Sequence, residues 1–140
     1  MKKLALGIGC RGGARMEIRK LKRKLDKGKF RGLNHAAAFI RRTMMNLLRK
    51  KAPKRVPSKP NTPPHRHASR GLAWGVLYSV DRRRGSAVIG PDYFRVKFCG
   101  MKHERGGMFK GAHYPRRPFA GPALKKVQSR LSRFWRASVR

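Results

Sequence analysis

The chain has 140 residues, and its 38 lysine and arginine side chains against 5 aspartate and glutamate side chains give a formal net charge of +33. This length is enough for one compact domain and leaves no room for a second core. So large a charge makes a compact chain repel itself and points to nucleic acid or an acidic protein surface as the partner. Because 39% of the residues are hydrophobic, we expect a folded core with basic arms rather than a disordered chain.

The first ten residues superficially resemble a lipoprotein signal, because two lysines and a short apolar run precede Cys10. The run from Leu4 to Ile8 is shorter than the apolar region of a secretory signal. No apolar run approaches the roughly 20 residues of a membrane span. Cys10 and Cys99 are too few for a disulfide framework and are interpreted as reduced, intracellular thiols. The sequence therefore predicts a soluble protein.

Residues 1–15 lack a helical period and are expected to form a basic N-terminal arm, followed by a single domain over residues 16–140. A narrow apolar stripe then predicts a helix that stops at Gly28, a favourable C-cap residue. A second helix is predicted from Asn34, a favourable N-cap, to Lys51. The stripe of the first helix is Ile18, Leu21 and Leu25, and the apolar face of the second is Ala37, Ile40, Met44, Leu47 and Leu48.

Residues 53–70 are rich in proline, have no hydrophobic period, and predict a long extended loop. Two interpretations stay open for this loop, namely an arm along an adjacent subunit and a mobile surface loop. After the loop, apolar residues alternate over 74–80 and predict a strand. Residues 81–85 form a turn with three arginines, and residues 86–89 a second strand.

Residues 93–98 (YFRVKF) predict a third strand and Met108-Phe109 a short fourth. A last helix begins after Gly121, with a core face of Leu124, Val127, Leu131, Phe134 and Trp135. The order of elements predicts an α+β fold in which an antiparallel sheet of three to four strands packs against two N-terminal helices and one C-terminal helix.

Catalytic chemistry has little support in this sequence. The neighbours His103 and Glu104 could act as an acid–base pair, but metal-dependent phosphodiester cleavage needs more carboxylates than the chain supplies. Cys99 and His103 lie four residues apart without the second close pair of a zinc site. Residues 7–12 have the GxGxxG spacing, but no strand precedes them. We expect no enzymatic activity, no metal and no cofactor.

Basic clusters along the chain are candidate contacts for nucleic acid or for an acidic partner. They lack the aromatic interleaving of a single-strand binder and the pattern of a recognition helix. Phosphate contact without sequence recognition is therefore expected. The candidate residues are Arg82, Arg83, Arg84, Lys50, Lys51, Lys54 and Arg55.

Residues 103–122 read HERGGMFKGAHYPRRPFAGP and are the most distinctive stretch of the chain. The glycine pair allows positive φ and close backbone approach, and the two prolines of YPRRP stiffen the connection. From these residues alone, two interpretations stay open. The stretch is either a rigid loop that presents Glu104, Tyr114 and Phe119 to a partner, or a surface loop whose aromatic side chains turn into the core.

His103-Glu104-Arg105-Gly106-Gly107, then Tyr114-Pro115-Arg116-Arg117-Pro118-Phe119 and a helix, resembles the neck and tail-completion proteins of tailed bacteriophages. The proline–histidine stretch over 63–67 is similar to the segment that precedes the family's first strand. The resemblance spans about residues 16 to 137. Arg105 stands where the family has an aromatic residue, and Arg116 stands where it has alanine.

The resemblance implies a structural virion protein, a ring component at the head–tail neck that joins the tail to the DNA-filled head. It also implies a homo-oligomer of six-fold symmetry, neighbouring neck and tail proteins and the end of the packaged DNA as partners, and a location in the virion after assembly in the host cytoplasm. A sequence-nonspecific nucleic-acid-binding protein of ribosomal or nucleoid type is the alternative. The subunit or ring contacts that the resemblance implies are His103, Glu104, Arg105, Gly106, Gly107, Tyr114, Pro115, Arg117, Pro118, Phe119, Pro63, Pro64 and His65.

Overall fold

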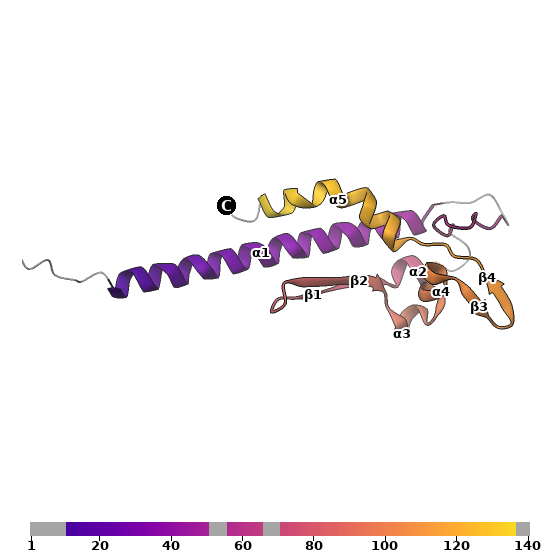
Figure 1. Ribbon diagram of the computed structural model, residues 1–140, viewed down its shortest axis with the longest axis horizontal. Coiled ribbons are helices and arrows are strands. Elements are labelled where there is room, and N and C mark those ends of the chain that lie inside the picture. The colour runs from indigo at the N-terminus through magenta and orange to yellow at the C-terminus, as the bar shows by residue number, and fades with distance from the viewer. Residues whose placement is uncertain (1–10, 51–55, 66–70, 137–140) are drawn as a thin grey trace, which may run out of the picture.

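One long helix, α1 (Arg11–Leu48), forms the axis of the molecule (Figure 1). The computed structural model describes residues 11–50, 56–65 and 71–136, with side chains described from residue 18 onward. Two separate helices were expected here, and that prediction is wrong, because the helix continues through Gly28 and Gly32. Both glycines are buried, so tertiary packing on this face outweighs the helix penalty of glycine. The predicted N-terminal arm also shortens, since residues 11–15 belong to α1.

The predicted hairpin is confirmed. Strand β1 (Val76–Asp81) pairs antiparallel with β2 (Ser86–Pro91), in a register that sets Val76 opposite Pro91 and Asp81 opposite Ser86. The Asp81 carboxylate accepts hydrogen bonds from the backbone N–H groups of Arg83 (2.8 Å) and Arg84 (3.1 Å), which fixes the turn. Both strands contact α1, and Figure 1 shows them along the side of α1 opposite α5.

The predicted third strand over 93–98 is wrong. Residues Tyr93–Val96 form the short helix α3, because the side chain of Asp92 caps it by accepting a hydrogen bond from the backbone N–H of Phe94 (3.3 Å). Helix α4 (Cys99–Arg105) follows, and the four-residue helix α2 (Gly71–Trp74) precedes the first hairpin.

A second, smaller hairpin forms a separate sheet, whereas a single sheet of three to four strands was predicted. Strand β3 (Gly107–Phe109) pairs antiparallel with β4 (Ala112–Tyr114). In the part of the chain that the structure describes, the strands thus form two sheets of two strands each. The α+β class is confirmed at this coarser level, as a long N-terminal helix, a C-terminal helix and two small antiparallel sheets.

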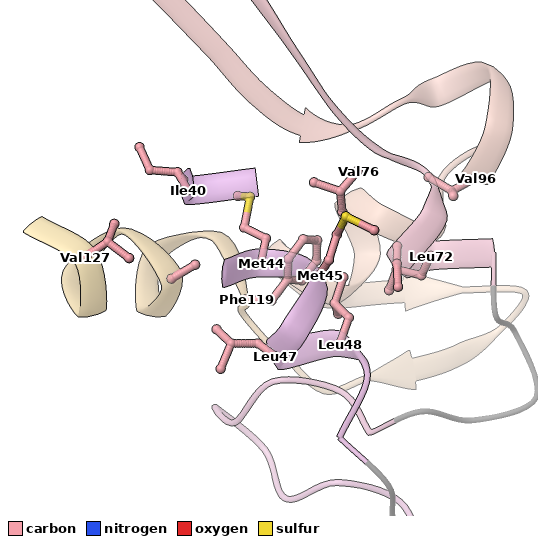
Figure 2. Close-up of a cluster of buried hydrophobic side chains, with 12 residues drawn as sticks. Ile40, Met44, Met45, Leu47, Leu48, Leu72, Val76, Val96, Phe119 and Val127 are labelled. Carbon is pink, nitrogen blue, oxygen red and sulfur yellow. The ribbon is translucent and has the colours of Figure 1, made fainter. Parts of the chain in front are cut away.

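The C-terminal helix α5 (Ala120–Arg136) packs along α1, as the apolar period of the sequence predicts. The core gathers at the C-terminal end of α1, where Phe119 and Val76 are fully buried. Figure 2 shows the apolar side chains that converge there from α1, from α5 and from the segments around α2 and α3. The core consists of Ile40, Met44, Met45, Leu47, Leu48, Leu72, Ala73, Val76, Val96, Phe119, Ala123 and Val127.

Candidate interaction surfaces

The two halves of the distinctive stretch 103–122 are joined through Glu104. Its carboxylate Oε2, at the end of α4, accepts hydrogen bonds from the backbone N–H groups of Phe119 (2.9 Å) and Ala120 (3.2 Å). These are orphan donors at the first turn of α5, where a negative charge is also favoured by the helix dipole. The backbone N–H of Arg117 donates to the carbonyl oxygen of His103 at 2.7 Å. Glu104 is thus the residue that fixes α5 to α4.

The glycine pair is needed for this joint. Gly106 has φ of 73°, and a Cβ atom there would lie 3.0 Å from the backbone nitrogen of Arg116 and 3.0 Å from the carbonyl oxygen of Tyr114. Gly107 follows with φ of 104°. A side chain at either position would be strained by the backbone conformation alone. The two glycines of His-Glu-Arg-Gly-Gly therefore have a local structural role, because they let the chain turn sharply from the end of α4 into β3.

The aromatic side chains of the stretch pack within the chain itself. The rings of His103 and Tyr114 meet edge to face at 5.3 Å, and the guanidinium of Arg117 lies 5.4 Å from the centroid of the Tyr114 ring. His103 is buried, Tyr114 is half-buried, and Phe119 has no exposed surface. Phe119 is therefore a core residue in the protomer. Within the two segments 103–107 and 114–119, the exposed residues are Arg105, Gly107 and Arg116.

The described middle of the proline-rich loop, residues 56–65, lies on the same stretch. The backbone N–H of Asn61 donates to the carbonyl oxygen of Arg116 (2.8 Å), and Arg117 Nε donates to the carbonyl oxygen of Ser58 (3.0 Å). Ser58 and Pro64 are buried, and the remaining predicted contacts of the region, Pro63, His65, Pro115 and Pro118, are half-buried. A contact of these residues with another subunit stays a prediction.

Exposed aromatic rings lie beside this stretch and, with Phe109, within it, and the sequence analysis did not predict that they form a surface. Tyr93 meets Phe94 at 6.1 Å and Phe98 at 5.3 Å between ring centroids, both edge to face. Phe94 is 87% exposed, and Tyr93, Phe98 and Phe109 are also exposed. A third strand over 93–98 would have buried alternate rings, whereas α3 turns only Val96 inward. We call Tyr93, Phe94, Phe98 and Phe109 the aromatic surface.

An apolar groove of about 220 Å³ opens within the aromatic surface, between Phe98 of the α3–α4 turn and Phe109 of β3. Val96 and Tyr114 complete its apolar lining, and Cys99, Lys97, Lys102 and His103 also border it. Partial burial raises the pKa of the Cys99 thiol above its ordinary value, so the thiol is mostly protonated near neutral pH. The groove thus offers mainly apolar contact.

A second cavity, of about 620 Å³, lies where the tip of the first hairpin meets α1 and the end of α5. The guanidinium of Arg82 lies 5.3 Å from the centroid of the Phe30 ring. We call this cavity the cationic pocket. It is lined by Asp26, Lys29, Phe30, Leu33, Arg82, Arg83, Arg84, Gly85 and Trp135.

Of the other predicted basic contacts, Lys50 is described by the structure and does not line this pocket. Lys50 is exposed just beyond the C-terminal end of α1, and the helix from Phe30 to Leu48 alone spans about 27 Å at 1.5 Å per residue. Lys51, Lys54 and Arg55 lie outside the described residues. The structure therefore separates Lys50 from the arginines of the hairpin turn.

Among the residues that the structure describes, no three His, Cys, Asp or Glu side chains are placed to hold a metal ion. In the same part of the chain, no helix is both long and apolar enough to cross a membrane. No family model, curated protein or solved structure matches the chain.

Proposed function

We propose that this chain is a structural virion protein of a tailed bacteriophage, a subunit of a ring at the head–tail neck that joins the tail to the DNA-filled head. The observation that carries the proposal is the aromatic surface, because soluble monomers rarely expose contiguous aromatic rings without a binding role. The segments His103–Gly107 and Tyr114–Phe119, in this order along the chain, resemble those of neck and tail-completion proteins. This resemblance is the reason for proposing that kind of assembly.

A ring of identical subunits needs two different surfaces on each copy, one that meets the next copy and one that meets the previous copy. The aromatic surface is one of them. The second is the apolar stripe of α1, since Ile18, Leu21 and Leu25 are 64%, 58% and 40% exposed on a helix that projects past the rest of the fold (Figure 1). The two surfaces lie toward opposite ends of the molecule, which suits a head-to-tail contact.

Charge decides the conditions under which such a ring closes. A subunit with a formal charge of +33 repels its copies, and the repulsion weakens when salt shortens the Debye length to about 3 Å at 1 M. The mass of the protein in solution, measured by light scattering at high and low salt without nucleic acid, tests the proposal. We expect a discrete multimer at high salt and a smaller species at low salt.

The change Phe94→Ser should remove the multimer at high salt, because Phe94 is the most exposed ring of the aromatic surface. Val88→Ser is the matched control, since Val88 is 75% exposed but lies on β2, outside that surface. A wild-type chain that stays monomeric at high salt, or equal effects of the two substitutions, would contradict the proposed contact.

Sequence-nonspecific nucleic-acid binding is the second candidate function, and the net charge of +33 is the observation that favours it. A monomer that binds duplex DNA with a steep salt dependence would support this candidate. Its light-scattering mass would stay that of one chain at every salt concentration in the absence of DNA, which separates the two functions in one experiment.

A further inference from the structure

The cationic pocket joins two kinds of side chain that lie far apart in the sequence. Its guanidinium groups come from the turn of the first hairpin, while its rings come from α1 and from the end of α5. We propose that this pocket binds an unpaired nucleotide of a nucleic-acid strand, with the phosphates on Arg82, Arg83, Arg84 and Lys29 and the base against Phe30 and Trp135.

The turn holds its arginines in a fixed place. The Asp81 carboxylate binds the backbone N–H groups of Arg83 and Arg84 through one oxygen, and its other oxygen lies 3.8 Å from Arg84 Nε. The Arg84 side chain is 86% exposed, so this ion pair is weak and leaves the guanidinium available to a phosphate. Guanidinium groups bind phosphate oxygens with two parallel hydrogen bonds. The turn thus holds the backbone of its arginines in place and leaves their guanidinium groups free to close on a phosphate.

The apolar part of the pocket fits a base. Phe30 and Leu33 are half-buried, and Trp135 is 38% exposed. Aromatic side chains beside cationic ones are the combination on which single-stranded nucleic acids stack their bases. The pocket volume of about 620 Å³ lies within the usual range of small-molecule sites, roughly 300–1,000 Å³.

The lining favours a nucleotide over other anions. Inorganic phosphate would use the arginines but not the rings, and an acidic peptide would bring further carboxylates toward that of Asp26. For a nucleotide, Asp26 instead offers an acceptor to an N–H donor of a base, such as the N3–H of thymine. A duplex has its base faces covered by stacking, so it can contact the arginines only. The pocket should therefore prefer a single strand to a duplex.

The binding of a fluorescein-labelled ten-residue oligothymidine, followed by anisotropy at one fixed salt concentration, tests this preference against a duplex of the same length. We expect Trp135→Leu and Phe30→Leu each to weaken single-strand binding roughly tenfold and to leave duplex binding unchanged, because stacking on a ring is lost. Arg82→Ala with Arg83→Ala should weaken both. Thermal unfolding of each variant identifies any loss of binding that comes from loss of the fold.

The control is Arg95→Ala. Arg95 forms a comparable exposed ion pair with Asp92 (3.7 Å) but lies outside the pocket, so the loss of this one charge should alter both affinities only slightly. Trp135 also gives a direct signal. In a Trp74→Phe variant it is the single tryptophan, and its fluorescence should be quenched by oligothymidine and by thymidine monophosphate, but not by inorganic phosphate or polyglutamate.

The nucleotide site would be overturned if the protein bound the single strand and the duplex with equal affinity, and if neither Trp135→Leu nor Phe30→Leu changed these affinities. Only phosphate contact would then remain. Quenching by polyglutamate as strong as that by oligothymidine would overturn it as well. Quenching by the oligonucleotide but not by the monophosphate would locate the specificity in the strand rather than in a free nucleotide. These results do not depend on ring formation, which is measured without nucleic acid.

Discussion

At the scale of single residues, Glu104 has the clearest role. Its carboxylate holds the backbone N–H groups of Phe119 and Ala120, and Phe119 is fully buried beside α1. Glu104→Ala leaves both donors without that acceptor, and we expect a loss of about 1–3 kcal/mol in the free energy of unfolding. Urea unfolding followed by circular dichroism measures this loss.

Two substitutions sharpen that measurement. Glu104→Gln keeps a carbonyl oxygen as acceptor and removes the charge, so it should be less destabilising than Glu104→Ala. Asp26→Ala changes the net charge by the same amount at an exposed site, and we expect a change within about 0.5 kcal/mol. Equal losses from Glu104→Ala and Asp26→Ala would show that charge, and not the cap, matters.

At the scale of elements, the sequence predicts correctly those helices and strands whose formation depends on neighbouring residues in the chain. The alternation before 81–85 and the turn residues predict the β1–β2 hairpin, and the apolar period after Gly121 predicts α5. The helix break at Gly28 was predicted wrongly because Gly28 is buried in the fold. The spacing of apolar residues along the sequence does not reveal which helix face is packed against other elements. Residues 93–98 alternate like a strand, but the Asp92 side chain caps a short helix over Tyr93–Val96, which buries Val96.

In the candidate sites too, the sequence identifies some residues, while the contacts between residues far apart in the chain are seen only in the fold. The two segments of 103–122 were singled out only by their resemblance to a family, and the hydrogen bonds from the start of α5 to Glu104 that join them are seen only in the fold. The sequence analysis found no aromatic residues interleaved with the arginines of 82–84. The fold supplies them from Phe30 and Trp135, because the middle of α1 and the end of α5 both lie beside the hairpin turn.

The N-terminal half of α1 should be the least protected part of the helix. Residues 18–27 are all exposed, whereas the core faces of residues 36–48 are buried. Helical stability in proteins comes mainly from packing of an apolar face, so amides of 18–27 should exchange with deuterium far faster than those of 36–48 at low salt. Mass spectrometry of peptides measures both segments in one sample.

The proposed ring adds a second expectation for the same segment. If the stripe of Ile18, Leu21 and Leu25 meets the aromatic surface of another copy, residues 18–27 should gain protection at high salt in the wild-type chain. The Phe94→Ser variant should not show this gain. Protection that rises with salt equally in both chains would mean that salt stabilises the helix itself, without contact between copies.

At the scale of the whole molecule, unbalanced charge sets the stability. The ion pairs Arg84–Asp81 and Arg95–Asp92 are exposed and join residues three apart in the chain, so they offset little of the formal charge of +33. Repulsion among the cations therefore opposes the compact state more than the expanded unfolded state. Unfolding should move to higher temperature as salt rises, because salt screens this repulsion.

A comparison of two anions distinguishes the screening of charge by salt from the binding of anions to the protein. Sodium chloride and sodium sulfate at equal ionic strength should act alike if only screening matters, while sulfate should act at lower concentration if guanidinium clusters bind it. We expect sulfate to be the more effective, and its advantage to shrink in the Arg82→Ala, Arg83→Ala variant, which lacks two of the three arginines of the hairpin turn. Sucrose raises stability without screening charge and should leave that variant's difference from the wild type unchanged. A melting temperature independent of salt would mean that the cations lie too far apart in the fold to oppose it.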